Sequence, residues 1–380
     1  MWNQHKFHLL INYKIKNKSE FLVDEPIKYY YNLAKVQKHA GFDFKLPSSM
    51  ETSEWIGDYN AYNLVKLSDT SNAVVMSYNY KQEKDDMCRG RYGMKLLIFK
   101  DDPFQSIEKI EKLNSSDVIS ENHEYNFKEN EKNYGKINGK EVTLEEKTPH
   151  SDGPASEIVT KYFIWQDDSV YYALKYDNAS LYAQDGQNFQ VVIHSICIDE
   201  NEVNKIVNSF KDIDLITDIN YKNIDSQHVI NCIYDNDDLI ESENILGFKA
   251  KIPNTFSNKN VKIQKSLIEN ADYSNEDKYR LDLYYNNEIE QIIYTQSICD
   301  CYNSYSDAEN KVDEPTTNNN NIEKVDVNGI KVYKYKIYNS ADNYYVYYLW
   351  KDNDVYNKLE IRYASSYEYD IAKEFINYKF

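Results

Sequence analysis

The sequence has few glycines and prolines for its length, with 10 glycines and 7 prolines among 380 residues. This scarcity excludes a collagen-like or proline-rich architecture and leaves little scope for low-complexity linkers. No stretch is apolar for long enough to cross a membrane as a helix. The N-terminus also lacks an uninterrupted hydrophobic region followed by a small-residue cleavage site, so it does not resemble a secretory signal.

Cysteines are equally sparse. The five of them form an odd set without symmetry, which is neither a disulfide framework nor a zinc-finger spacing. Cys299 and Cys301 are too close in sequence for an easy intramolecular bridge. We therefore interpret most of the cysteines as core thiols. The full set is Cys88, Cys197, Cys232, Cys299 and Cys301.

Basic residues are outnumbered by acidic ones, 44 to 62, which leaves a formal net charge of −18. Binding to nucleic acid needs a basic patch that displaces counterions from the phosphates, so this charge argues against a nucleic-acid partner. It also disfavours direct adsorption to an anionic membrane. Otherwise the acidity indicates only a soluble, self-repelling chain.

Signatures of catalysis and of cofactor binding are missing as well. There is no glycine-rich phosphate loop and no Gly-x-Ser-x-Gly elbow. His150 and His194 each precede a serine, but neighbours in a strand point to opposite faces, so adjacency makes no nucleophile–base pair. The acidic clusters near Asp167 and Asp235 do not match an EF-hand loop. We predict no enzyme activity, no cofactor and no metal site.

What the chain does have is a duplication, because three short patterns occur twice in the same order. The gaps between them are longer in the first copy, as expected where surface loops vary in length. We therefore predict two copies of one folded module. The patterns are Gly-Phe-x-x-Lys-(Leu/Ile)-Pro at 41–47 and 247–253, (Ile/Val)-Asn-Gly at 137–139 and 327–329, and Trp-x-Asp followed by Val-Tyr at 165–171 and 350–356.

Each copy is predicted to open with a helix that stops at a glycine, from Asp24-Glu25-Pro26 to Gly41 and from about Asp237 to Gly247. The Asn-Gly pairs predict two-residue hairpin turns, and the acidic residues after each tryptophan predict further turns. A closing amphipathic helix is indicated in both copies. Its apolar positions are Val203, Val207 and Phe210 in the first copy and Ile371, Phe375 and Tyr378 in the second.

Strand-like segments dominate the rest. Residues 74–80 and 94–99 are expected to be antiparallel neighbours, as are 281–285 and 289–294. The 37 tyrosines suit a half-buried pleated surface. We predict an α+β fold with two tandem copies of a curved antiparallel sheet, half-barrel-like, with flanking helices.

The predicted organisation has four parts. An N-terminal strand-like extension covers 1–23, a first module 24–212, a packed connector 213–234 and a second module 235–380. Exposed loops are expected at 114–133 and 311–321. The longer loops of the first copy, about 100–135 and 176–190, are where we expect copy-specific function.

The helix that runs into Gly-Phe-x-x-Lys-(Leu/Ile)-Pro, the mid-domain Asn-Gly, the Trp-x-Asp-x-x-Val-Tyr strand pair and the closing helix resemble a domain of unknown function. That domain occurs in extracytoplasmic lipoproteins and anti-sigma-factor-like proteins of Gram-positive bacteria. It is similar in outline to the half-barrel of lipoprotein carriers and sigma regulators. The resemblance covers roughly 24–212 and 235–380 and implies no catalytic residues.

The function expected from the resemblance and the composition is non-enzymatic binding or sensing outside the cytoplasm or at the cell surface. A signal or anchor is not visible in this chain, and a cytoplasmic location is the alternative. The partner would be a protein or an apolar ligand. A self-associating envelope or spore-surface protein is the alternative function.

Trp165 and Trp350 are the candidate ligand-binding residues, because a half-barrel can hold an apolar guest between its sheet and a helix. A repeated aromatic at equivalent places is more often a structural anchor between sheet and helix. Both interpretations stay open at the level of sequence.

Overall fold

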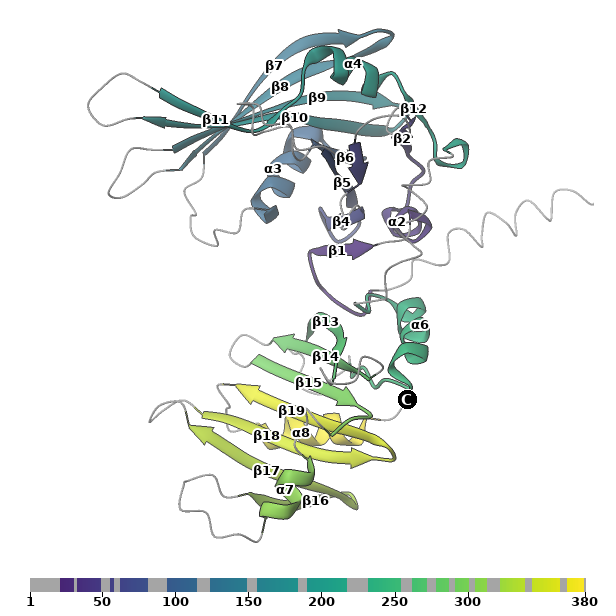
Figure 1. Ribbon diagram of the computed structural model, residues 1–380, viewed down its shortest axis with the longest axis vertical. Coiled ribbons are helices and arrows are strands. Elements are labelled where there is room, and N and C mark those ends of the chain that lie inside the picture. The colour runs from purple at the N-terminus through teal and green to yellow at the C-terminus, as the bar shows by residue number, and fades with distance from the viewer. Residues whose placement is uncertain are drawn as a thin grey trace, which may run out of the picture. The chain divides into compact units, whose positions relative to one another are not determined.

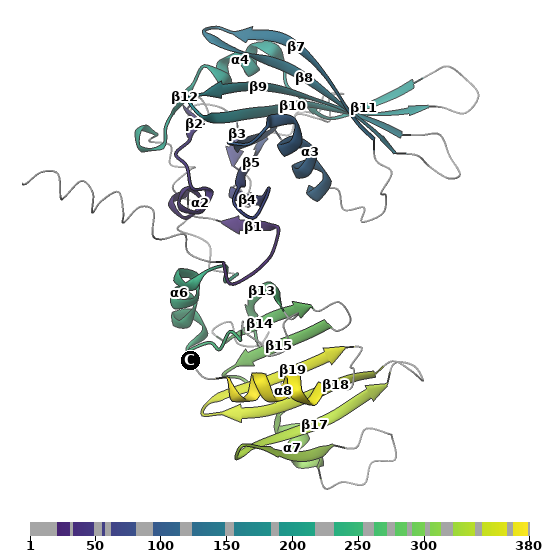
Figure 2. The same ribbon diagram turned by 180° about the vertical axis from the view of Figure 1, so that it is seen from behind.

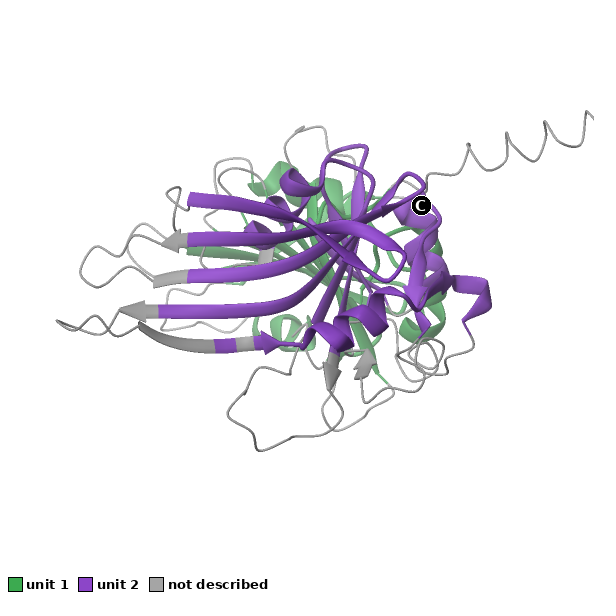
Figure 3. Cartoon of the chain, turned by 90° about the horizontal axis from the view of Figure 1, so that it is seen from above, with its two compact units in different colours: residues 1–25, 229–380 green, residues 26–228 purple. Residues whose placement is uncertain are grey.

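The computed structural model describes residues 21–30, 33–48, 55–57, 62–80, 94–114, 124–148, 156–183, 190–216, 232–253, 262–271, 278–286, 291–300, 305–312, 322–338, 344–362 and 368–378. The chain folds into two compact units (Figure 3). Residues 26–228 form one, here called the N-terminal unit. Residues 229–380, together with the described residues before Pro26, form the other, here called the C-terminal unit.

The N-terminal unit is built on an antiparallel sheet with the strand order β1-β4-β5-β6-β10-β9-β8-β7 (Figure 1). β11 also pairs with β10 and β3 with β5, while β2 and β12 form a separate ribbon. The strands are β1 (Ile27–Tyr30), β2 (Lys45–Pro47), β3 (Trp55–Gly57), β4 (Tyr62–Lys66), β5 (Asn72–Tyr80), β6 (Met94–Phe99), β7 (Glu124–Tyr134), β8 (Ile137–Thr148), β9 (Ser156–Asp167), β10 (Val170–Ala183), β11 (Gln190–Cys197) and β12 (Phe210–Asp212). The helices are α2 (Leu33–Ala40), α3 (Pro103–Asn114), α4 (Glu200–Val207) and the 3-10 turn η2 (Ile213–Leu215).

The C-terminal unit contains a sheet with the order β13-β14-β15-β19-β18-β17-β16 (Figure 1). Its strands are β13 (Lys262–Asn270), β14 (Tyr279–Asn286), β15 (Gln291–Ser297), β16 (Glu323–Val327), β17 (Ile330–Tyr338), β18 (Tyr344–Asp352) and β19 (Val355–Arg362). Its helices are α6 (Asn236–Leu246), α7 (Tyr305–Lys311) and α8 (Glu368–Asn377).

The two sheets share one topology. The order β4-β5-β6-β10-β9-β8-β7 in the N-terminal unit matches β13-β14-β15-β19-β18-β17-β16 in the C-terminal unit, strand by strand. Along the chain, a helix separates the third of these seven strands from the fourth in both units. A helix also comes after the seventh strand, directly in the C-terminal unit and after the additional strand β11 in the N-terminal unit. The antiparallel α+β fold class is confirmed, with open sheets as the larger component.

Both units bury apolar side chains on each face of the sheet. In the N-terminal unit, α3 covers one face with Ile107 and Ile110, both fully buried. In the C-terminal unit, α8 covers one face with Ile371 and Phe375. The short α7 lies on the opposite face and contributes Ala308 to a small cluster (Figures 1 and 2).

Several local predictions are confirmed. Gly41 and Gly247 follow α2 and α6 with φ of 78° and 73°, the left-handed conformation that glycine adopts without a steric penalty. The turns after the tryptophans contain Asp168 and Asn353 at φ 52° and 53°. The expected pairs β5–β6 and β14–β15 are antiparallel neighbours.

The first Asn-Gly pair is not a turn, contrary to prediction. The β7–β8 turn is formed by Gly135 and Lys136, whereas Asn138 and Gly139 lie inside β8. A Cβ on Gly139 would approach the Ile164 carbonyl oxygen to 2.4 Å, so glycine is required there by the adjacent strand. The second pair, Asn328-Gly329, does form the predicted two-residue turn between β16 and β17.

The first opening helix and both closing helices are shorter than predicted, whereas α6 spans the range predicted for the second opening helix. Residues 27–30 form strand β1, so the described part of the first helix begins only at Leu33. Phe210 lies in β12 rather than in α4, and Tyr378 follows the end of α8. Pairing with β4 and β2 overrides the helical spacing at both Ile27 and Phe210.

The predicted loops are partly regular structure. Residues 103–114 form the helix α3, whereas 124–134 form β7 and 176–183 extend β10, so the last two segments lengthen the sheet. Residues 1–20 of the predicted N-terminal extension, His150 and most of the predicted loop 311–321 lie outside the described residues.

Candidate functional site

Trp165, at the end of β9, is 4% exposed and lies among other aromatic side chains. Its ring stacks on Tyr172 of β10 at 5.2 Å and on Phe163 at 5.4 Å. Phe210 of β12 meets it edge-on at 5.0 Å. The surroundings of Trp165 are thus the protein's own rings, which fasten β12 to the sheet.

Trp350 occupies the equivalent place in β18 and is fully buried. It stacks on Tyr294 at 5.7 Å, and Tyr294 in turn meets Phe375 of α8 at 5.1 Å. The Trp350 indole nitrogen is buried and has no hydrogen-bond partner among the described residues. The two tryptophans therefore anchor equivalent corners of the two sheets through different neighbours.

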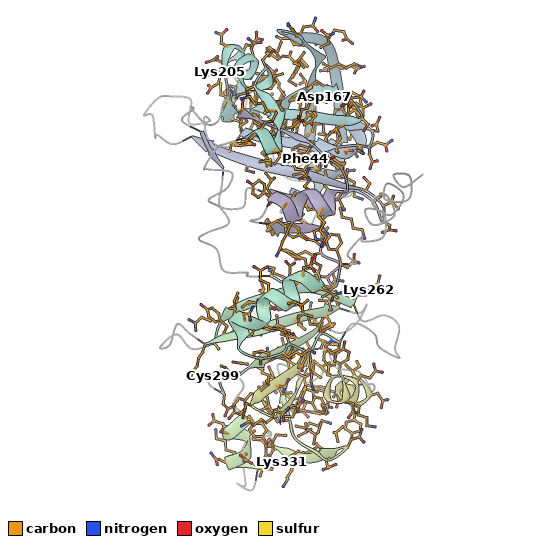
Figure 4. The ribbon with its side chains drawn as sticks, turned by 90° about the vertical axis from the view of Figure 1, so that its right-hand side faces the viewer. Phe44, Asp167, Lys205, Lys262, Cys299 and Lys331 are labelled. Atoms are coloured by element: carbon orange, nitrogen blue, oxygen red, sulfur yellow. The ribbon has the colours of Figure 1, made fainter. Side chains whose placement is uncertain are left out.

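The first and third repeated patterns are joined by the same ion pair in each unit. The Lys45 ammonium is 2.6 Å from Asp167, and the Lys251 ammonium is 2.5 Å from Asp352 (Figure 4 labels Asp167). The hydrogen bond to Asp167 raises the pKa of Lys45, although burial acts in the opposite direction. The lysine of Gly-Phe-x-x-Lys and the aspartate of Trp-x-Asp therefore have a structural role in both units, because they form this ion pair.

Features that both copies share therefore hold the fold together, and the differences between the copies point to function. The largest difference lies on the face that α3 covers in the N-terminal unit. There the sheet presents apolar side chains that are completely or almost completely buried beneath the helix. They include Val75, Leu97, Phe99, Val142 and Ala173.

A buried ionic cluster fastens α3 to this apolar face. The Glu111 carboxylate of α3 is 3.1 Å from the Lys175 ammonium and accepts a hydrogen bond of 2.6 Å from Tyr162. Burial alone would raise the pKa of Glu111, but Lys175 and Tyr162 together lower it. Burial lowers the pKa of the neighbouring Lys95, and Lys175 adds to this effect.

The same face is polar in the C-terminal unit. Because Trp165 corresponds to Trp350 and Val170 to Val355, the strand registers give the equivalent positions directly. Polar residues replace the apolar ones, and the charge at the position of Lys175 is reversed. The replacements are Val75 by Asp282, Leu97 by Thr295, Phe99 by Ser297, Ala173 by Lys358 and Lys175 by Glu360.

One half of this face is a hydrogen-bonded ionic network. Arg280 lies 2.7 Å from Asp282 and 2.5 Å from Glu269. Thr295 donates to the other oxygen of Asp282 at 2.6 Å. Asp282 and Thr295 are buried, while Glu269 is exposed at the rim. This network replaces the apolar layer seen beneath α3.

The other half is an aromatic and cationic layer, here called the platform, which comprises Tyr335, Tyr345, Tyr347, Lys358, Glu360 and Arg362. Tyr347 and Glu360 are buried, and the other four are half-buried. Tyr335 and Tyr347 stack at 4.8 Å, and the Lys358 ammonium lies over the Tyr347 ring, 5.4 Å from its centroid. Arg362 is 2.6 Å from Glu360 and lies over Tyr345. Burial, assisted by Glu360, raises the pKa of Tyr347 to about 12, so its hydroxyl stays protonated at neutral pH.

Helix α7 covers only one corner of this face. It has 7 residues, against 12 in α3. Tyr305 packs on Tyr333 at 5.2 Å, and Glu309 accepts a hydrogen bond from Tyr333 and pairs with Lys331, which is labelled in Figure 4. Among the described residues, no helix side chain occupies the place that Glu111 takes in the N-terminal unit.

The remaining sequence candidates have structural roles or lie elsewhere. Asp235 and Asp238 form the capping box of α6, as expected for a helix start. His194 contacts Asp177 at 3.0 Å on neighbouring strands, and the Ser195 side chain is not described. No group of three or more potential metal ligands occurs in the described part of the chain.

The prediction of core thiols can be compared with the structure at three cysteines, because Cys88 and Cys301 lie outside the described residues. Cys197 and Cys232 are free and half-buried, and burial raises the pKa of the Cys232 thiol. Cys299 is disulfide-bonded. None of the helices over the described ranges is long and apolar enough to span a membrane.

Comparison with known proteins found no matching family model, curated protein or solved structure. The platform itself was missed by sequence reasoning. Aligning the two copies around Trp165 and Trp350 would have shown the change from Lys175 to Glu360. Only the strand register, however, shows that this change shares one face with Lys358, Tyr347 and Arg362.

Proposed function

We propose that this chain is a non-enzymatic binding or sensing protein that acts outside the cytoplasm and recognises a protein partner or an apolar ligand. Recognition is assigned to the C-terminal unit, through the platform. The N-terminal unit is the copy whose corresponding face is closed by its own helix. A cofactor plays no part in this proposal.

The observation that carries the proposal is the divergence of one face between two sheets of identical strand order. In the N-terminal unit that face is apolar and covered by α3. In the C-terminal unit it carries stacked tyrosines with Lys358 and Arg362 above them. Aromatic residues and arginine are enriched where proteins bind one another.

The extracytoplasmic setting and the family resemblance belong to the same proposal. The shared strand order supports the idea that both units are copies of a half-barrel-like domain. The disulfide at Cys299 supports an oxidising compartment, because such bonds rarely persist in a reducing cytosol. A Gram-positive lipoprotein or sigma-regulator context follows only from the resemblance of the repeated patterns.

The test is affinity capture of partners by the full chain, with quantitative comparison of two variants. Tyr335→Ala combined with Lys358→Glu removes the aromatic stack and reverses one platform charge. Lys140→Glu is the matched control, since it disrupts only an exposed pair with Glu129 in the N-terminal unit. We expect a partner that is lost about tenfold with the platform variant and retained with the control. Equal recovery with both variants would remove the platform from the proposal.

A self-associating envelope or spore-surface protein is the second candidate, favoured by the exposure of Tyr338 (52%). Light scattering across a range of protein concentrations separates the two. Growth of the particle mass with concentration, in the absence of any captured partner, would favour the structural role.

A further inference from the structure

The outer edge of β17 in the C-terminal unit is covered over a shorter length than the equivalent edge of β8 in the N-terminal unit. In the N-terminal unit, β7 pairs with β8 along 11 residues, including Glu129 opposite Val142 and Asn126 opposite Glu145. In the C-terminal unit, β16 has 5 residues, and its pairing with β17 stops at Glu323 opposite Lys334. Within the described residues, 335–338 of β17 therefore have a strand on one side only, namely β18.

The register shows which backbone groups face this open edge. Val327 and Ile330 flank a two-residue turn, where the flanking residues exchange both of their backbone hydrogen bonds. Alternate residues of β17 after Ile330 point the same way, so Lys336 and Tyr338 direct their N–H and C=O groups outward. The edge is a template for one further strand.

Side chains around the edge are suited to a particular occupant. Ile337 is 36% exposed and Tyr338 52% exposed, which places apolar surface on both faces of the strand end. Ile337 lies on the same face as Tyr335 of the platform, and Lys336 lies on the opposite face, 3.6 Å from Glu368. The last pair of the β16–β17 ladder already sets an acid, Glu323, opposite Lys334. An acid opposite Lys336 would continue that pattern.

We propose that the edge formed by 335–338 of β17 binds an extended acidic peptide segment of another protein as an added antiparallel strand. This inference rests on the proposed function and names its partner class. Apolar side chains of the segment lie opposite Tyr335 and Ile337 and extend the platform. Carboxylates lie opposite Lys336. The N-terminal unit shows the arrangement completed, because β7 occupies the equivalent edge of β8 with Phe127 opposite Leu144.

A second copy of this chain fits the edge less well. Antiparallel pairing of 335–338 with itself brings two Lys336 side chains onto one face of the same short stretch. Like charges so close across a ladder are destabilising. The acidic segment removes this repulsion and is therefore the occupant that the charges favour.

The experiment titrates the full chain into a fluorescein-labelled peptide of sequence Glu-Phe-Glu-Ile-Glu-Phe-Glu and follows anisotropy. The control peptide has lysine in place of every glutamate. We expect the acidic peptide to bind and the lysine peptide to bind at least about tenfold more weakly. Tyr338→Pro removes one outward N–H without touching the bonds to β18, and should weaken binding about tenfold.

Two further variants keep the test decisive. Tyr338→Thr retains the N–H and should change affinity by about threefold or less, whereas Lys336→Glu should weaken binding about fivefold. Equal binding by wild type and Tyr338→Pro, or no binding to wild type, would overturn the inference. Self-association of wild type that Tyr338→Pro abolishes would also overturn it, by making a second copy the occupant. The platform variant changes Tyr335, which also belongs to the edge, but Tyr338→Pro leaves every platform side chain unchanged. Partner capture that is lost with the platform variant and kept with Tyr338→Pro would therefore overturn this inference while supporting the proposed function.

Discussion

At the scale of single residues, the two Asn-Gly pairs show how one dipeptide serves two purposes. Gly329 sits at φ 83° in a hairpin turn, with nothing within 4 Å of a Cβ. Gly139 lies inside β8, where a Cβ would meet the Ile164 carbonyl at 2.4 Å and the Phe163 ring at 2.7 Å. Backbone conformation therefore requires the glycine at 329, and close packing requires the glycine at 139.

Alanine substitutions should separate these causes. We expect Gly139→Ala to destabilise the N-terminal unit by about 2–3 kcal/mol, because strand β9 must shift. Gly329→Ala should cost the C-terminal unit about 1 kcal/mol through its left-handed backbone alone. Urea unfolding, monitored by hydrogen exchange in each unit, measures the loss of stability in both variants. A larger loss for Gly329→Ala than for Gly139→Ala would contradict the packing argument.

At the scale of elements, α3 is fastened to its sheet by a carboxylate in an apolar layer. The Glu111 side chain is 15% exposed and the Lys175 side chain 7%. Replacing Glu111 with Gln leaves the Lys175 ammonium buried without its counter-charge. We expect a loss of about 3 kcal/mol in the stability of the N-terminal unit at neutral pH.

The lowered pKa of Glu111 makes its contribution to the stability of the N-terminal unit depend on pH. A carboxyl whose pKa is lower in the folded state adds stability above its unfolded pKa, and loses it as the pH falls through the folded value. The stability gap between wild type and Glu111→Gln should therefore shrink below about pH 4.3. Denaturant titrations between neutral and acidic pH measure the gap. A gap that does not change with pH would mean that Glu111 acts through packing rather than charge.

The repeated ion pair allows a matched comparison between elements. Lys45 and Asp167 are 34% and 39% exposed, whereas Lys251 is only 14% exposed beside Asp352. Solvent screens the first pair more, so its coupling energy should be well below about 1 kcal/mol. Double-mutant cycles with alanine should show the larger coupling for Lys251–Asp352. A larger coupling at Lys45–Asp167 would contradict this ranking.

At the scale of the whole molecule, the segment before the N-terminal unit belongs to the C-terminal unit. The Leu22 amide donates to Tyr234 at 2.8 Å, and the Asp24 amide donates to Ile263 at 2.9 Å. Val23 is 2% exposed in the core of the C-terminal unit. The chain thus contributes to this core before it builds the other unit.

Val23→Asp should therefore destabilise the C-terminal unit, although most of that unit follows the N-terminal unit in the sequence. We expect a loss of about 3 kcal/mol or more, since a carboxylate would enter an apolar core. Hydrogen exchange should show lower protection in β19 and unchanged protection in β6. Val36→Asp in α2, where Val36 is fully buried, is the matched control and should give the opposite pattern. Lower protection in β6 with Val23→Asp would contradict the assignment.

Predictions from sequence succeeded where a few adjacent residues decide the structure. The turn at Asn328-Gly329 and the helix stops at Gly41 and Gly247 depend on backbone freedom at single positions. Sequence reasoning failed where pairing with a distant strand decides. The residues of β7 were predicted as part of an exposed loop because the stretch is charged, yet β8 supplies their hydrogen bonds and Phe127 packs on the core.

The sequence by itself determined the duplication, the antiparallel α+β class and the tryptophan-centred patterns, because motifs and turns are read locally. Only the tertiary structure decided which side chains share a face and which edge is left open. The register of each strand against its neighbours decides which side chains share a face, and those neighbours lie far along the chain. The platform and the outer edge of β17 are therefore visible only in the folded chain.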